Sequence, residues 1–148
     1  PDTDGVGEIH LTGPMVMTGY INKEPIDGDF NTDDIGYIDE DGFVYILNRR
    51  KDLIISGGEN IYPKELENLV YTLPSVKECA VVPVPDAKWG QVPALFVAFH
   101  DGKSLPPEDI IVFMKDSLAK YKIPKYVKVL TALPRNGTGK ILRNELKL

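Results

Sequence analysis

Residues 52–66, DLIISGGENIYPKEL, change from a strand pattern to a helical one and thereby decide the order of the fold. The run Asp52–Ser56 is typical of a buried strand, and the two glycines after it indicate a tight turn. Pro63 then fits the first position of a helix, where no backbone N–H is needed. The apolar residues of this helix follow at helical spacing: Leu66, Leu69, Val70 and Leu73. Pro74 ends the run, so a strand–turn–helix unit is expected here.

Downstream of this helix, the sequence predicts further strands and two more helices. Strands are expected over 76–82, 94–100 and 126–130, a second helix from Pro106-Pro107 to Leu118, and a short last helix over 140–148. Residues 51–148 are therefore predicted to form a compact ββαββαβ(α) domain. The predicted fold class is α+β.

Residues 1–50 are predicted to form a separate, β-rich piece. Val6–Leu11 alternates along its length, and two β-rich runs flank the Asp-Gly turn at 39–42, which is a strong hairpin signal. The basic cluster within 48–52 joins this piece to the domain that follows. This cluster is either a solvated turn or a joint that carries function.

Composition excludes several kinds of protein. With 43% hydrophobic residues, the 148-residue chain is expected to pack a core. One cysteine, Cys79, and two histidines far apart exclude an internal disulfide and a four-cysteine zinc site, so no metal ligands are assigned. No apolar run approaches the ~18–20 residues of a membrane span, and the N-terminus lacks the pattern of a signal peptide. A cytoplasmic protein is therefore expected.

The net charge of −5 hides a strong asymmetry along the chain. Residues 1–47 hold eleven acidic residues and one basic residue, whereas 120–148 hold eight basic residues and one acid. A basic end on an acidic protein indicates either a local site for a polyanion or a solvated helix face. The acidic total and the single tryptophan argue against nucleic acid as the partner.

A lysine among glycines near the C-terminus is the first candidate for chemistry. Residues 135–140, RNGTGK, place Lys140 after glycines that would let backbone N–H groups approach a phosphate. The segment is not a P-loop, because Pro134 and Ile141 occupy two of the positions that a P-loop requires. It is thus either a lysine on a mobile, glycine-flanked loop or a plain loop.

Three other features each allow a structural and a functional interpretation. Gly57-Gly58 is either a tight turn or a place where a ligand approaches the backbone. Trp89, in a loop rich in proline and aspartate, is either a lid on the core or an exposed stacking surface. Asp33-Asp34 could cap a turn, bind a metal or hold sugar hydroxyls. A nucleophilic role for Cys79 is not expected, because it lies in an apolar strand.

Several motifs occur together and in order along the chain. They are Gly7-Glu8-Ile9, Gly19-Tyr20, Thr32–Gly36, Asn48–Glu67, Trp89-Gly90-Gln91, Lys122–Lys125 and Gly137–Lys140. This order resembles the C-terminal part of the adenylate-forming superfamily, which contains acyl-CoA synthetases, luciferases and the adenylation domains of peptide synthetases. The resemblance covers essentially the whole chain. It implies that residues 1–50 are the end of a large N-terminal domain plus a hinge, and that 51–148 are a mobile C-terminal lid domain.

The resemblance implies a two-step reaction with ATP, Mg²⁺ and CoA. A carboxylic acid attacks the α-phosphate of ATP to form an acyl-adenylate, and the CoA thiol then displaces AMP. Lys140 matches the catalytic lysine that bridges the two anions in the first step. Asp34 matches the carboxylate that holds the ribose hydroxyls, and Arg49 matches the arginine beside it.

The resemblance also implies the residues of the second step. Lys51 matches the hinge about which the lid domain rotates between the two steps. The residues expected to contact CoA or its pantetheine arm are Gly57, Gly58, Glu59, Trp89, Tyr121, Lys122 and Lys125. Two positions depart from the superfamily pattern, since Asp33 and Asn48 stand where glycine is usual. Asn48 is expected to be a mild change because asparagine tolerates positive φ.

Nothing in the chain matches the superfamily's phosphate loop or its acyl pocket, and the first residue is Pro1 rather than methionine. We therefore expect the C-terminal portion of a ligase about three times as long, which alone is inactive and holds no cofactor. The expected partners of the complete enzyme are ATP, CoA, a carboxylic acid and its own N-terminal domain. Two alternatives stay open: an adenylation domain that loads a carrier protein, and a nucleotide-binding module without catalysis.

Overall fold

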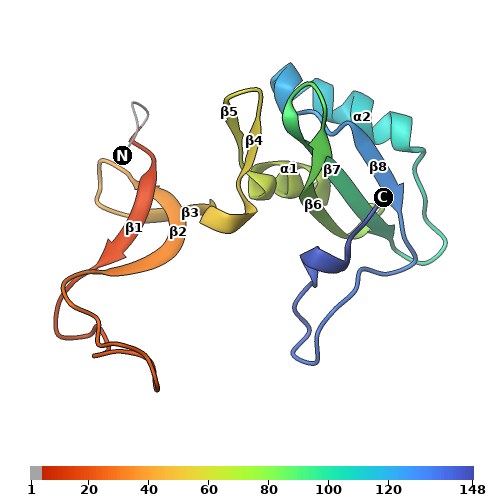
Figure 1. Ribbon diagram of the computed structural model, residues 1–148. Helices are drawn as coiled ribbons and strands as arrows, with labels where there is room; N and C mark the ends of the chain where they lie inside the picture. The colour runs from red at the N-terminus through yellow and green to blue at the C-terminus, as the bar shows by residue number, and fades with distance from the viewer. Residues whose placement is uncertain (1–4) are drawn as a thin grey trace. The chain divides into compact units, whose positions relative to one another are not determined.

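The computed structural model describes residues 5–148, which fall into two compact units, one ending at Lys51 and the other running from Asp52 to Leu148. Each unit has its own sheet (Figure 1). The first unit contains the strands β1 (Gly7–Leu11), β2 (Phe30–Ile38) and β3 (Val44–Arg49) in an antiparallel sheet of order β1-β2-β3. A 3-10 turn, η1 (Arg50–Asp52), spans the boundary between the units.

The predicted hairpin joins β2 to β3. The side chain of Asp39 closes its turn, because Asp39 Oδ1 accepts the N–H groups of Asp41 and Phe43 at 3.1 and 2.8 Å. β2 begins at Phe30, because its pairing with β1 continues to Leu11 opposite Phe30. Around this hairpin, four large apolar side chains are more than half exposed: Ile38, Phe43, Val44 and Ile46.

The second unit confirms the predicted ββαββαβ order. Its elements are β4 (Ile54–Ser56), β5 (Glu59–Ile61), α1 (Pro63–Tyr71), β6 (Val76–Asp86), β7 (Gly90–Phe99), α2 (Pro107–Lys115), η2 (Lys120–Lys122), β8 (Tyr126–Val129) and η3 (Arg143–Glu145). The sheet order is β5-β4-β7-β6, and β8 pairs in parallel with β7. The sheet is therefore built around β7, with β6 at one edge.

Alternation along β6 and β7 gives the sheet two apolar faces. Helices α1 and α2 cover the first face, whose buried residues include Ile54, Leu66, Cys79, Val81, Leu95, Ile110 and Met114. The chain after β8 covers the other face. Its buried residues Leu133 and Leu146 pack in one cluster with buried residues of the sheet: Ala80, Val82, Ala94, Phe96 and Ala98. The C-terminal segment is thus held on a face of the sheet opposite to the helices.

Side chains cap the free edge of β6. Tyr71 Oη accepts the N–H of Cys79 at 3.2 Å and donates to its carbonyl at 3.4 Å. Glu67 Oε1 accepts the N–H of Val81 at 2.8 Å, and Arg143 Nη1 donates to the carbonyl of Val81 at 2.8 Å. These bonds satisfy edge groups that would otherwise be available to another strand.

The prediction of a last helix over 140–148 is wrong. Only the single turn η3 is helical, and the rest of the segment is irregular. Nine residues form a marginal helix at best, so packing decides the conformation. Here Leu146 is buried against the sheet, and Arg143 reaches back to Glu67 on α1. Among the helices of residues 5–148, none is long and apolar enough to cross a membrane.

The buried thiol of Cys79 should be chemically inert in the folded protein. Burial, with the nearby Glu67 carboxylate, raises the pKa of Cys79 to about 12. Because the thiolate is the reactive form, we expect a disulfide reagent at pH 8 to modify Cys79 at least about 100-fold more slowly in the native chain than in denaturant. Equal rates with and without denaturant would contradict the buried position.

Candidate active site

Lys140, predicted to lie either on a mobile, glycine-flanked loop or on a plain loop, lies on a closed hairpin. Arg135 and Ile141 form a β-bridge at its base. The N–H of Asn136 donates to the carbonyl of Lys140 at 2.9 Å, and the N–H of Leu142 donates to that of Pro134 at 2.8 Å. The segment 134–142, called the lysine hairpin below, is therefore ordered by its own backbone bonds.

The amide of Asn136 organises the tip of the lysine hairpin. Its Oδ1 atom accepts the N–H of Thr138 at 3.1 Å, the hydroxyl of Thr138 at 2.8 Å and the N–H of Lys140 at 2.8 Å. Lys140 itself is exposed, and no residue among 5–148 pairs with its ammonium group. A fixed backbone thus carries a cation whose charge is free to meet an anion.

The lysine hairpin is tied to the sheet through Glu78 on β6. The carboxylate of Glu78 accepts the N–H of Leu133 at 2.9 Å and Nε of Arg135 at 3.1 Å, and it also pairs with Arg135 Nη2. Burial acts to raise the pKa of Glu78, but these hydrogen bonds outweigh burial and hold the pKa below its usual value. Glu78 is therefore a buried anion with partners, rather than a proton donor.

A second arginine pins the chain just after the lysine hairpin. Arg143 Nη1 and Nη2 lie 2.7 and 3.0 Å from the two carboxylate oxygens of Glu67. Burial lowers the pKa of Arg143, but the bonds to Glu67 more than offset it, so the net shift is upward. Arg143 Nε also lies 4.0 Å from Asp52, which follows Lys51.

Asp34 and Arg49 are brought together as predicted for a nucleotide site. They face each other across β2 and β3, with Arg49 Nε 2.8 Å from Asp34 Oδ1. Arg49 Nη1 also donates to the carbonyl of Thr32 at 2.9 Å. A positive φ was considered for Asn48, one of the two positions where glycine is usual in the superfamily. Asp33, rather than Asn48, has a positive φ of 59°, which aspartate adopts more readily than most residues.

Lys51 stands between two anchored neighbours. On one side, Arg50 Nη1 lies 2.6 Å from Glu8 Oε1, within the first unit. On the other side, Asp52 lies beside Arg143, within the second unit. Within 5–148, the side chain of Lys51 has no partner. Because both neighbours are tied to their own unit, a change of φ and ψ between the units would concentrate at Lys51.

The Gly57-Gly58 turn rests on Trp89. Gly57 has φ of +61°, its N–H donates to the carbonyl of Trp89 at 2.9 Å, and a Cβ atom at Gly57 would lie 2.6 Å from the Trp89 ring. The ring is 47% exposed, so it is a support for the turn that also offers an open surface. Glu59 follows on β5, exposed, directly opposite Ser56.

Asp86 fixes Trp89 in place and also holds Lys125. Its Oδ1 atom accepts the N–H groups of Lys88 and Trp89 at 2.9 and 3.0 Å, and its Oδ2 atom lies 2.5 Å from Lys125 Nζ. The hydrogen bond from Lys125, with those from the two backbone N–H groups, lowers the pKa of Asp86 to about 2. Gly57, Trp89 and Lys125 are thereby brought into one group.

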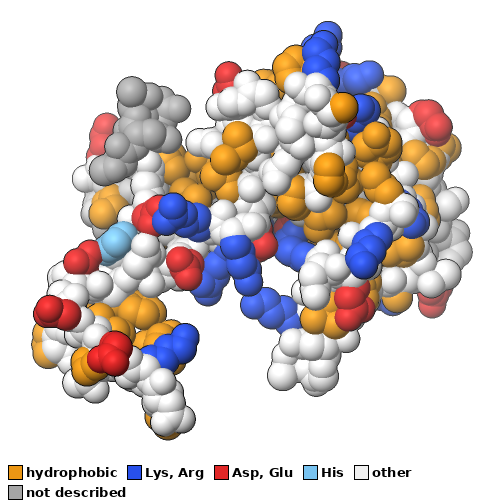
Figure 2. Space-filling model, in the orientation of Figure 1, with side chains coloured by type: hydrophobic (Ala, Val, Ile, Leu, Met, Phe, Trp, Pro, Cys, Tyr) orange, Lys and Arg blue, Asp and Glu red, His pale blue; other side chains and the backbone are white. Residues whose placement is uncertain are grey.

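The two lysines expected to meet CoA phosphates are already in ion pairs. Lys125 binds Asp86, and Lys122 Nζ lies 2.7 Å from Glu65 on α1. Tyr121 beside Lys122 is 43% exposed. On the face shown in Figure 2, lysine and arginine side chains lie in separate groups with acidic, apolar and uncharged surface between them. Four of the eight basic residues of the basic end are thus in ion pairs within the fold: Lys122, Lys125, Arg135 and Arg143.

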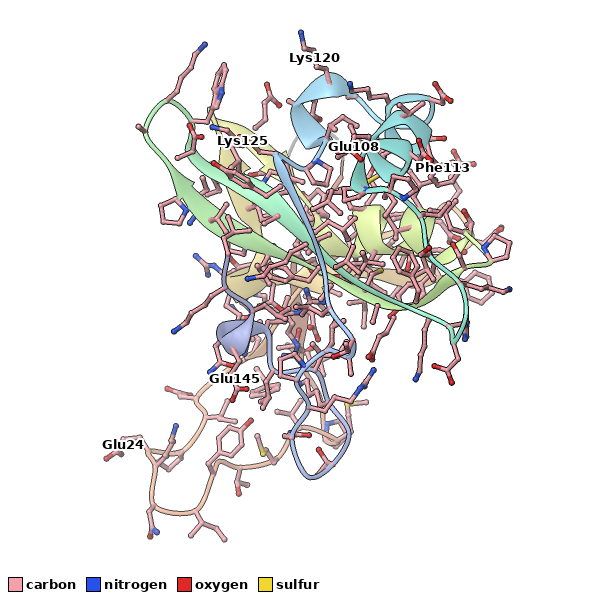
Figure 3. The ribbon with its side chains drawn as sticks, turned by 90° about the vertical axis from the view of Figure 1, so that its right-hand side faces the viewer. Glu24, Glu108, Phe113, Lys120, Lys125 and Glu145 are labelled. Atoms are coloured by element: carbon pink, nitrogen blue, oxygen red, sulfur yellow. The ribbon has the colours of Figure 1, made fainter. Side chains whose placement is uncertain are left out.

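Two sets of candidate residues lie at opposite ends of the second unit. The lysine hairpin is at one end, and Gly57, Trp89 and Lys125 are at the other. In Figures 1 and 3 the lysine hairpin extends below the sheet and the β6–β7 turn lies above it, and Figure 3 places Lys125 near that turn. Among residues 5–148, no group of three or more His, Cys, Asp or Glu side chains could hold a metal ion.

The comparisons with known proteins agree with this geometry. The profile of the AMP-binding enzyme C-terminal domain matches residues 65–140, which is just over half of the chain. The chain belongs to this family. The predicted resemblance to the adenylate-forming enzymes is thereby confirmed, as is the predicted α+β fold.

Relatives within this group of enzymes match almost the entire chain. A 2-succinylbenzoate–CoA ligase of Lactococcus lactis is 57% identical over 146 residues, which are 99% of this chain and 32% of the relative. The structure of o-succinylbenzoate CoA synthetase from Bacillus subtilis with its acyl-adenylate intermediate superimposes with a TM-score of 0.88 and 46% identity, over 96% of this chain and 30% of that one. The same synthetase with ATP and a magnesium ion gives 0.86 and 44%, over 95% and 30%. The chain thus spans about a third of the length of these relatives.

Sequence reasoning missed the carboxylates that hold the site together: Glu67, Glu78 and Asp86. A signal for Glu78 was available, because it is the one acid within the otherwise apolar run 78–82 of a predicted strand. Such an acid indicates a buried partner. The identity of that partner, Arg135, could not be read from the sequence, because the two lie 57 residues apart.

Two neighbouring glycines offer a matched test of the Trp89 support. Gly57→Ala should destabilise the fold by about 1–3 kcal/mol more than Gly58→Ala, because both carry positive φ but only the first would press a Cβ atom into the Trp89 ring. Chemical denaturation followed by tryptophan fluorescence measures the difference. If the two variants lost the same stability, the ring would not be packed against Gly57.

Proposed function

We propose that the complete protein is an AMP-forming carboxylate–CoA ligase whose acid is 2-succinylbenzoate. In the first step, the acid carboxylate attacks the α-phosphate of ATP, and acyl-adenylate and pyrophosphate form. In the second step, the CoA sulfur attacks the acyl carbon, AMP leaves, and acyl-CoA remains. The observation that carries the proposal is the 57% identity, over 99% of this chain, to a 2-succinylbenzoate–CoA ligase. The resemblance of the sequence would place this reaction in menaquinone synthesis, in the cytoplasm.

Lys140 serves the first step. The reacting carboxylate and phosphate are both anions, so bringing them together costs electrostatic energy unless a cation lies between them. The ammonium of Lys140 is exposed and unpaired within 5–148, while the backbone that carries it is fixed by Asn136. Asp34 holds the ribose hydroxyls, and Arg49 fixes the orientation of the Asp34 carboxylate. When Mg²⁺ is bound with ATP, it supplies further charge neutralisation.

The second step uses the opposite end of the second unit. There the exposed turn at Gly57-Gly58 and the open surface of Trp89 form a path for the pantetheine arm. Glu59 and Tyr121 line its approach, and Lys122 and Lys125 meet the CoA phosphates by exchanging their carboxylate partners for phosphate. Because the two groups of residues lie at opposite ends, one site can be presented only after the other is withdrawn. Rotation about Lys51 performs this exchange.

The first unit, residues 1–50 with the hinge, is proposed to be the end of the large N-terminal domain, and 51–148 the lid. The exposed apolar side chains around the β2–β3 hairpin support this assignment, since such a patch is costly in water unless another surface covers it. CoA rather than a carrier protein is proposed as the acceptor, because the relatives are named as CoA ligases.

Removal of the Lys140 ammonium should separate the two steps. In the complete protein, Lys140→Ala should slow ATP–pyrophosphate exchange with 2-succinylbenzoate by about 100-fold or more, because the cation acts where charge is brought together. Thioester formation from preformed acyl-adenylate should change by less than about 3-fold. An equal loss in both half-reactions would contradict the assignment of Lys140 to the first step.

The hinge can be tested by fixing one dihedral angle. Lys51→Pro should impair thioester formation more than adenylation, because the proline ring locks φ at the residue between the two units. The same two half-reaction assays measure the effect, and Lys51→Ala is the control that removes the side chain but leaves φ free. If Lys51→Pro left the ratio of the two rates unchanged, the hinge would lie elsewhere.

A further inference from the structure

The hydrogen bonds of Glu78 do more than give a buried carboxylate its partners, because Arg135 also contacts the lysine hairpin. The side chain is 9% exposed and lies on β6, and both carboxylate oxygens are used, one by the N–H of Leu133 and the other by Arg135. A buried carboxylate needs such partners, since an unpaired one would be strongly unfavourable. This explains why the arginine is present, but it does not explain where its remaining N–H groups point.

Arg135 uses its other terminal nitrogen on the lysine hairpin itself. Nη1 donates to the carbonyl oxygen of Gly139 at 2.6 Å, while Nε and Nη2 face Glu78. Gly139 immediately precedes Lys140 and has φ of +82°. The planar guanidinium therefore connects a rigid strand with the peptide group that leads into Lys140. A lysine at position 135 could not make both connections in fixed geometry.

We propose that Glu78 and Arg135 are positioning residues for Lys140, acting through the carbonyl of Gly139. The proposal rests on the function proposed above for Lys140. The segment 137–139 contains two glycines, which lose the most conformational freedom when they are ordered. Asn136 fixes the hairpin tip from within, and Arg135 ties the carbonyl of Gly139 to the sheet through Glu78. Without this tie, the ammonium would spend less time where the two anions meet.

The guanidinium fork has a direct test in the complete protein. Arg135→Lys keeps a cation beside Glu78 but removes the fixed bond to Gly139, so the fold should largely keep its stability. We expect ATP–pyrophosphate exchange to fall by roughly 10-fold or more, because a small displacement of a catalytic group is costly. Transfer from preformed acyl-adenylate to CoA should change by less than about 2-fold. Glu78→Gln, which leaves Arg135 without its anchor, should give the same selective loss.

A control removes contacts on the same strand that do not reach the hairpin. Tyr71→Phe deletes the hydroxyl that bonds Cys79, the residue next to Glu78, and should lower thermal stability without changing the ratio of the two half-reactions. If the ratio shifted equally in Tyr71→Phe and Arg135→Lys, loss of stability would explain both, and the positioning role would be overturned.

The outcomes also separate this proposal from the one on which it rests. If Lys140→Ala leaves adenylation intact, the proposed function of Lys140 fails. If Lys140→Ala abolishes adenylation while Arg135→Lys and Glu78→Gln retain the full rate, the function stands and the positioning role is wrong. A selective loss in all three variants, with Tyr71→Phe unchanged in its ratio, supports both.

Discussion

A carboxylate buried in a sheet must be given partners, and the arrangement of the C-terminal segment depends on this constraint. Glu78 on β6 receives Leu133 and Arg135, and Glu67 on α1 receives Arg143. The segment after β8 has almost no regular structure of its own. Two arginine–glutamate pairs, together with apolar packing onto the sheet, hold it in one path. The position of Lys140 follows from that path, because Lys140 lies between Arg135 and Arg143 in the chain.

The proposed function asks one small unit to serve two steps. The lysine hairpin, in the segment after β8, and the β6–β7 turn lie at opposite ends of the second unit (Figure 1). Neither would have to change its internal structure when the unit turns. Under the proposed function, the movement would fall on Lys51, whose neighbours Arg50 and Asp52 are paired with Glu8 on one side and Arg143 on the other. An alternation between two sites would require rigid units joined at a residue whose φ and ψ can change.

The strand and helix order of the second unit was predictable, because period, proline and glycine agree along residues 52–130. The last helix was not, since the conformation after Ile141 is set by Leu146 and Arg143 packing on distant residues rather than by local pattern. Motifs singled out Lys140, Asp34 and Arg49 as candidate site residues, but the sequence could not reveal that Lys122 and Lys125 are paired with acids. Those pairs join residues 57 and 39 positions apart, so nothing local signals them.

Amide hydrogen exchange on the 148-residue chain tests most directly whether Lys140 sits on a fixed hairpin. We predict that the N–H of Lys140, which donates to Asn136, exchanges far more slowly than an N–H of an unstructured peptide. The N–H of Leu133, which donates to Glu78, should be protected in the same way. The exposed turn at 101–102 should exchange rapidly and serves as the internal reference. Protection at Leu133 combined with free exchange at Lys140 would contradict the account, because the hairpin would then be mobile beyond its anchor.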